Sequence, residues 1–126
     1  MKKTIWIYII VLIIAVGGVV YLAKAPSGPG PLDQFATCIK DSGTKFYGAF
    51  WCPHCQATKK MFGTSASLLP YIECSTPDGN SQNATCNAAK IESYPTWEFK
   101  DGSRISGEQT LQTLAEKTSC TLPQGY

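Results

Sequence analysis

Two cysteines separated by two residues, Cys52 and Cys55, stand between two segments with different patterns. The residues before them, 45–51, read KFYGAFW, a short apolar and aromatic run typical of a buried strand. The residues after Cys52 begin with Pro53, which suits the first position of a helix, and reach Gly63, which suits the end of one. The sequence therefore predicts a strand, the cysteine pair and then a helix.

A cysteine at the start of a helix has distinctive chemistry. Unpaired N–H groups and the positive end of the helix dipole stabilise a thiolate there, and the thiolate is the species that attacks disulfides. Cys55 would lie one turn later on the same face, within reach of Cys52. We therefore expect a redox-active catalytic pair in which Cys52 is the exposed nucleophile and Cys55 the buried resolving thiol.

Two neighbours of the pair each allow two interpretations. Trp51 is either an aromatic shield beside the sulfur or a residue of the core. His54 is either a donor or cation near the Cys52 sulfur, which would favour the thiolate further, or an exposed histidine on the first helical turn.

The rest of the chain alternates between helical and strand patterns. The order of elements, α-β-α-β-α-β-β-α, indicates one α/β domain over residues 32–126. The predicted elements are a helix from 32 to about 43, strand 45–51, helix 53–62, strand 68–74, a weak helix 83–92, strand 96–100, a turn at 101–102, strand 104–106 and a helix through 111–118.

An apolar segment precedes this domain. Residues 5–23 are 19 consecutive uncharged and mostly apolar residues. As a helix they would extend about 28 Å, close to the hydrocarbon thickness of a bilayer. The alternative is a cleaved signal peptide, for which Lys2 and Lys3 would form the basic region. The run is longer than the usual signal core, and Pro26 would directly follow the cleavage site.

We therefore expect a membrane-anchored protein. The predicted parts are a cytoplasmic region at 1–4, a transmembrane signal-anchor at 5–23, a Pro/Gly linker at 24–31 and the folded domain beyond it. The basic N-terminus places this domain outside the cytoplasm, in the periplasm, the cell-wall space or the thylakoid lumen.

Charge and cysteine content exclude two other classes. From residue 25 onward eight basic residues face nine acidic ones, so no basic stripe is present to bind nucleic acid. A zinc site needs four ligands at workable spacing, whereas the chain has a single CxxC, so we expect no metal. In an exported domain the four other cysteines are best interpreted as disulfides. They allow three pairings, of which we favour Cys74–Cys86 and Cys38–Cys120.

The cysteine motif and its surroundings resemble a known family. Residues 45–62 resemble the thioredoxin superfamily, and the tetrapeptide CPHC at 52–55 resembles that of DsbA-type periplasmic oxidases. A closer resemblance, to the thioredoxin-like domain fused to bacterial vitamin K epoxide reductase homologues, covers most of the domain. It is carried by FYGAFWCPHC at 46–55, LPYIEC at 69–74, PDG at 77–79 and SYPTWEF at 93–99.

This resemblance implies a thioredoxin-like fold, with a mixed sheet of about four strands flanked by helices behind the N-terminal transmembrane helix. It also implies a disulfide-introducing oxidase, with a potential near about −120 mV rather than the about −270 mV of thioredoxin. In that family a membrane protein reoxidises the domain and passes electrons to a quinone, so the domain itself binds no cofactor. The implied partners here are a separate vitamin K epoxide reductase-like integral membrane protein and exported, cysteine-containing clients.

The resemblance also assigns roles to individual residues. Pro95, preceded by Tyr94, matches the cis-proline that lies beside the active-site sulfurs. The same two disulfide pairings are implied. Many relatives carry a buried acid six residues before the first cysteine, whereas Phe46 occupies that position here, so water or another group must handle the proton of Cys55.

Other functions compete with the oxidase hypothesis. The same cysteine chemistry would serve an extracytoplasmic reductase or isomerase supplied by a membrane electron donor. A non-catalytic module held together by three disulfides is a further alternative. One of the two outer disulfides could also relay electrons from the membrane partner.

Overall fold

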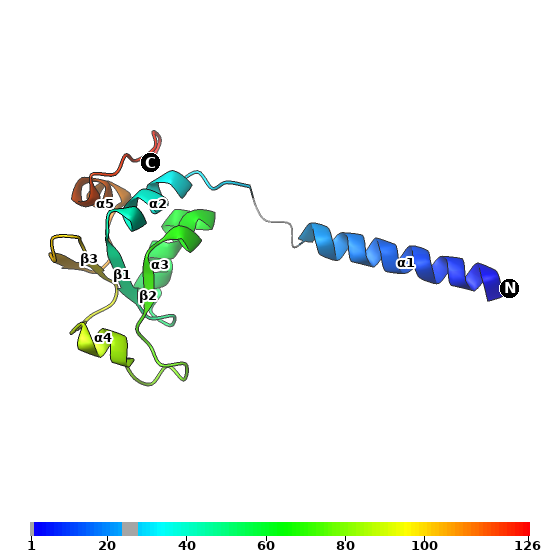
Figure 1. Ribbon diagram of the computed structural model, residues 1–126, viewed down its shortest axis with the longest axis horizontal. Helices are drawn as coiled ribbons and strands as arrows, with labels where there is room; N and C mark the ends of the chain where they lie inside the picture. Colours follow the sequence, from blue (N-terminus) through cyan, green and yellow to red (C-terminus); the bar gives the residue numbers. More distant parts are fainter. Residues whose placement is uncertain (1, 24–27) are drawn as a thin grey trace.

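The computed structural model describes residues 2–23 and 28–126, and four residues of the predicted linker, 24–27, lie outside the described part. Figure 1 follows the chain from the N-terminal helix into the folded domain. The helices and strands are α1 (Lys2–Ala23), α2 (Asp33–Asp41), β1 (Lys45–Gly48), α3 (Pro53–Phe62), the 3-10 helix η1 (Gly63–Leu68), β2 (Tyr71–Glu73), α4 (Ala84–Ala88), β3 (Thr96–Glu98), β4 (Arg104–Ser106) and α5 (Leu111–Thr118).

The four strands form one mixed sheet in the order β2-β1-β3-β4. Strand β1 runs parallel to β2 and antiparallel to β3, and β4 pairs antiparallel with β3 at the far edge. Phe46 on β1 stands opposite Tyr71 on β2 and Trp97 on β3. This mixed four-stranded sheet with its helices fits the predicted thioredoxin-like fold.

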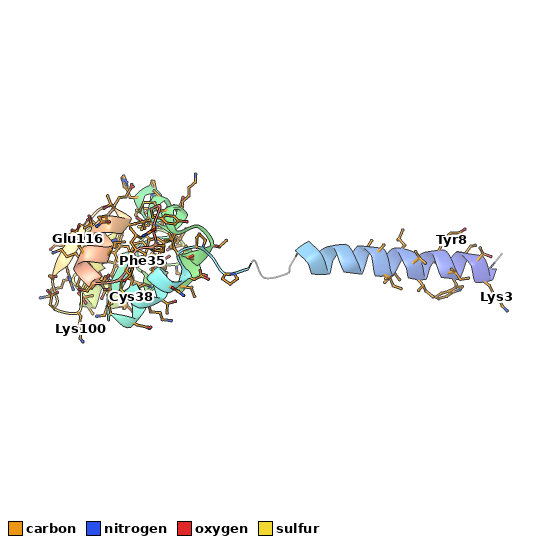
Figure 2. The ribbon with its side chains drawn as sticks, turned by 90° about the horizontal axis from the view of Figure 1, so that it is seen from above. Lys3, Tyr8, Phe35, Cys38, Lys100 and Glu116 are labelled. Carbon is orange, nitrogen blue, oxygen red and sulfur yellow. A yellow bond between two sulfur atoms is a disulfide. The ribbon has the colours of Figure 1, made fainter. Side chains whose placement is uncertain are left out.

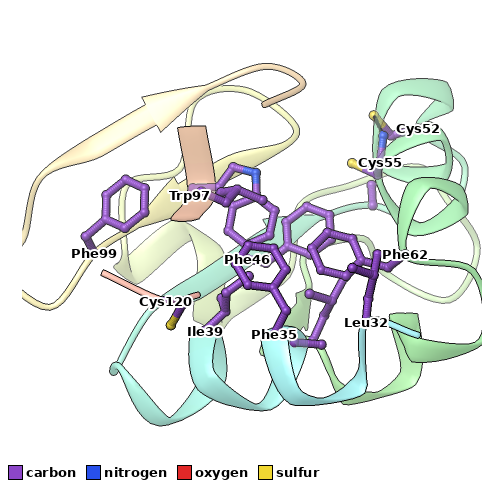
Figure 3. Packing of buried hydrophobic residues seen from close by; sticks show 14 residues of the cluster. Leu32, Phe35, Ile39, Phe46, Cys52, Cys55, Phe62, Trp97, Phe99 and Cys120 are labelled. Atoms are coloured by element: carbon purple, nitrogen blue, oxygen red, sulfur yellow. Dashed lines mark hydrogen bonds between the residues drawn. The ribbon is translucent and has the colours of Figure 1, made fainter. Parts of the chain in front are cut away.

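The core joins the sheet to helices α2, α3 and α5. Aromatic rings provide much of the contact, because Phe46 stacks on Trp97 with ring centroids 4.4 Å apart and Phe35 stacks on Phe62 at 5.9 Å. Figure 3 shows these four side chains with both active-site cysteines at the edge of the same cluster. Burial of this apolar surface therefore holds the start of α3 against the sheet.

Three strands and one helix are shorter than the sequence predicts. Strand β3 ends at Glu98 rather than at residue 100, because the turn that follows it begins at Lys100. The helix predicted at 83–92 is limited to α4, Ala84–Ala88. Strand β1 ends at Gly48 rather than at residue 51, because the backbone turns and the Cys52 N–H donates to the Ala49 carbonyl at 3.0 Å. The strand predicted at 68–74 begins only at Tyr71. The 3-10 helix continues through residue 68, and Pro70, which has no N–H, precedes the strand.

The predicted transmembrane segment, 5–23, falls within α1. A spanning helix needs about 20 consecutive apolar residues. Across residues 2–23 and 28–126 no helix is long and apolar enough to cross a membrane, so the structure does not support that prediction. The large apolar side chains of α1 between Ile5 and Val16 are exposed, and Figure 2 shows them around the helix near Tyr8.

Candidate active site

Cys52 caps the N-terminus of α3. Its backbone is extended, with φ −73° and ψ 119°, and Pro53 occupies the first helical turn as predicted. The Cys55 backbone N–H donates to the Cys52 sulfur at 3.4 Å. The sulfur thus takes the place of a capping oxygen, where an N–H group and the positive end of the helix dipole favour a negative charge.

Both active-site cysteines are free thiols, and both are buried. Cys55 is 1% exposed, as expected of a resolving thiol, but Cys52 is only 4% exposed, so the prediction of an exposed nucleophile was wrong. The loop at Tyr94 explains the difference, because the Cys52 thiol lies 3.7 Å from the Tyr94 carbonyl oxygen, to which it donates. The bond between Tyr94 and the buried Pro95 is cis.

Trp51 lies on the surface rather than in the core. Its side chain is about half exposed, at 50%, and its indole N–H donates to the Ser75 hydroxyl at 2.9 Å. The ring meets Tyr94 edge-on, with centroids 6.0 Å apart. Phe50, which sequence reasoning did not single out, is exposed to a similar degree. The cysteine pair is therefore preceded by an exposed aromatic pair.

His54 points to the surface, where its Nδ1 lies 2.5 Å from the Glu108 carboxylate. The imidazole is 67% exposed. The structure therefore favours the interpretation of an exposed histidine on the first turn over a donor to the Cys52 sulfur. Glu108 was missed by sequence reasoning because it lies 54 residues further along the chain, with no local pattern that connects the two.

The two sulfurs differ in their surroundings. Burial raises the pKa of the Cys55 thiol to about 12, and its hydrogen bond with Cys52 acts in the same direction. A hydrogen bond with the Ala49 backbone and, to a smaller extent, the Lys59 charge oppose this effect. Cys55 is therefore a protonated thiol at neutral pH, whereas the Cys52 sulfur lies at the helix N-terminus and accepts the Cys55 N–H. The arrangement makes Cys52 the attacking sulfur, whereas burial makes Cys55 a poor leaving group unless another group stabilises its thiolate.

The other four cysteines form two disulfides away from this pair. Cys38 joins Cys120, and Cys74 joins Cys86, the pairing expected from the sequence. Cys74 and Cys86 are fully buried, so a partner's thiol has no access to their sulfurs. This burial favours a structural role over an electron relay for Cys74–Cys86. Among the described residues no group of three or more His, Cys, Asp or Glu side chains could hold a metal ion.

The fold and the site together define a domain of thioredoxin-like architecture with a CxxC pair at the start of a helix. Over 91 residues the chain is 46% identical to "Thiol-disulfide oxidoreductase LTO1" of Arabidopsis thaliana. The aligned part covers 68% of this chain but only 24% of that protein, so the chain spans about a quarter of its relative's length. No protein-family model matches the chain. The similarity supports a thiol–disulfide oxidoreductase.

Proposed function

We propose that this protein is a thiol–disulfide oxidoreductase that introduces disulfides into exported proteins. The observation that carries the proposal is the position of the Cys52 sulfur, which caps α3 and accepts the Cys55 N–H at 3.4 Å. A site that stabilises the Cys52 thiolate stabilises the reduced protein, and this makes the disulfide a stronger oxidant. The similarity to a thiol–disulfide oxidoreductase supports the same chemistry.

The proposed reaction is two successive thiol–disulfide exchanges. A client thiolate attacks the Cys52 sulfur of the oxidised pair, the Cys52–Cys55 bond breaks, and Cys55 leaves with the electron pair. A second client thiolate then attacks the client sulfur of the mixed disulfide and releases Cys52. The client loses two electrons and gains a disulfide, and the cysteine pair is left reduced.

A membrane protein resembling vitamin K epoxide reductase is the proposed oxidant of the reduced pair. This protein would accept the two electrons and pass them to a quinone, so the present chain would need no bound cofactor. The support is the sequence resemblance carried by residues 46–55, 69–74 and 93–99. The two outer disulfides support an oxidising, extracytoplasmic compartment for the domain.

A reduction potential tests the direction of the reaction. We expect the Cys52–Cys55 couple, equilibrated with glutathione, to have a reduction potential of about −120 mV, because the site stabilises the reduced form. The redox state is measured by acid quenching, alkylation of free thiols and mass spectrometry of the peptide 52–55. The Cys74–Cys86 disulfide, which should stay oxidised throughout, is the internal control. A potential near about −270 mV would instead indicate a reductase.

We further propose that α1 attaches the domain to a membrane. The support is the row of exposed apolar side chains from Ile5 to Val16, which in water would carry a large unfavourable hydration free energy. The full chain is expected to sediment with phospholipid vesicles, and a variant without residues 2–23 is expected to stay in the supernatant. Failure of both forms to sediment would contradict membrane attachment, while the reduction potential would remain a separate test of the chemistry.

A further inference from the structure

The Cys55 sulfur becomes a thiolate when the disulfide opens, and the residue at position 46 cannot stabilise this negative charge. When the disulfide opens, a full negative charge appears on a sulfur that is 1% exposed. Phe46, which is fully buried and stacked on Trp97, is an apolar side chain without a charge or an ionisable proton. Burial of a charge costs free energy unless an opposite charge or a hydrogen-bond donor is close.

The Cys55 sulfur and the ring of Tyr71 both lie close to Gly48. A Cβ atom added at Gly48 would stand 2.9 Å from the Cys55 sulfur and 2.8 Å from Cε2 of Tyr71. The sulfur and the edge of the tyrosine ring therefore approach the same point, and only a glycine at position 48 leaves room for both. This approach connects β2, which carries Tyr71, to the reacting sulfur.

Lys59 brings a positive charge to a face of this ring. Its ammonium nitrogen lies 3.2 Å from the centroid of Tyr71, a close cation–π contact. Lys59 is also four residues after Cys55 on α3, so the two side chains share one face of the helix. The positive charge lowers the pKa of the Cys55 thiol, in opposition to burial.

Tyr71 is itself held in place by a carboxylate. Its hydroxyl donates to Oε2 of Glu73 at 2.8 Å, and Oε1 of Glu73 accepts the N–H groups of Phe50 at 3.2 Å and Ser75 at 2.9 Å. Burial, followed by the Glu73 hydrogen bond, raises the pKa of Tyr71 well above its usual value. The phenol therefore stays neutral, and its hydrogen bond fixes the ring on which Lys59 rests.

We propose that Lys59 is the counter-charge for the Cys55 thiolate that forms when the disulfide opens, and that Tyr71, anchored by Glu73, positions it. The groups that act on Cys55 in this arrangement are Cys52 at the start of α3, the backbone of Ala49, Lys59 on α3 and Tyr71 on β2. Lys59 would stabilise the thiolate until solvent supplies a proton. This inference rests on the proposed exchange reaction. It adds Lys59 as the residue that stabilises the Cys55 thiolate and Tyr71 as the residue that positions Lys59.

The rate at which the disulfide opens tests the proposal. Oxidised protein is mixed with dithiothreitol at pH 7, and reduction of Cys52–Cys55 is followed by acid quenching and alkylation. We expect Lys59→Met to slow opening by about tenfold, since a unit charge near a partly buried thiolate has an effect of this order. Lys60→Met is the matched control because Lys60 is adjacent, equally charged and exposed, and it should react like the natural protein.

Two further variants separate charge from packing. Lys59→Arg keeps the charge and should restore most of the rate. Tyr71→Leu should slow opening, and the double variant Lys59→Met/Tyr71→Leu should be no slower than Lys59→Met, because the two residues act as one unit. Four outcomes would each overturn the proposal. Lys59→Met could open at the rate of the natural protein, or Lys60→Met could slow opening as much as Lys59→Met does. Lys59→Arg could fail to restore the rate, or the double variant could show the sum of the two single losses.

These outcomes are distinct from failure of the proposed function. If the natural protein has an oxidising potential and opens rapidly, but Lys59→Met opens as fast, only the role of Lys59 is lost. If the Cys52–Cys55 disulfide of the natural protein resists dithiothreitol, the exchange reaction itself is contradicted.

Discussion

Replacing Cys52 with serine is expected to remove all measurable disulfide exchange, whereas replacing Cys55 with serine should leave the first half of the reaction. A serine hydroxyl is not ionised at neutral pH, so no nucleophile would remain at the start of α3. In Cys55→Ser the Cys52 thiolate can still attack a disulfide, but no second sulfur is present to resolve the product. The two variants should therefore fail at different steps.

Incubation of each variant with a disulfide-bonded peptide, followed by acid quenching and mass spectrometry, distinguishes these steps. Cys55→Ser should accumulate a mixed disulfide through Cys52, and Cys52→Ser should accumulate none because Cys55 is 1% exposed. Trapping through Cys55 would reverse the assigned roles. Exchange that survives in Cys52→Ser would place the reacting sulfur elsewhere.

Replacing both Cys38 and Cys120 with alanine should lower the free energy of unfolding by about 4 kcal/mol, as the entropy of closing a long loop suggests. The two residues are 82 positions apart, and their disulfide ties α2 to the segment after α5. The same change at Cys74 and Cys86, only 12 positions apart, should cost about 3 kcal/mol. For a domain of this size either loss is a large share of its stability.

Urea denaturation of the natural protein and both double variants measures these differences, with the slope of each transition as the check on the unfolded state. Disulfide exchange at Cys52 should persist in each variant at urea concentrations where the domain remains folded. A loss below about 1 kcal/mol for the Cys38 and Cys120 variant would show that the unfolded chain is compact without this bond.

Local signals predicted the helix of the active site well. Pro53 and Gly63 bound α3 because both act through their own backbone conformations, which depend little on distant residues. The turn at Asp101-Gly102 is correct for the same reason, since Gly102 has φ 81°. The closing helix, predicted from the spacing of its apolar residues, is also correct. Short strands were less predictable, since the ends of β1 and β2 depend on how the backbone turns after Gly48 and Leu68.

Contacts between distant residues could not be predicted in this way. Burial of Cys52 depends on the Tyr94 loop, and the partner of His54 is Glu108, 42 and 54 residues away respectively. The cluster of Lys59, Tyr71 and Glu73 exists because β1 and β2 are parallel neighbours, which no local pattern states. The absence of an acid at Phe46 was visible in the sequence, but the side chains behind Cys55 were not.

The low exposure of Cys52 affects which conformations of a client can react with its sulfur. The Cys52 residue is 4% exposed and its thiol donates to the Tyr94 carbonyl, so a client cysteine has to approach closely past this loop to react. An extended, flexible chain can bring a single side chain to the sulfur. If the domain oxidises clients as proposed, we expect it to react faster with a reduced, unfolded client than with the same client after folding.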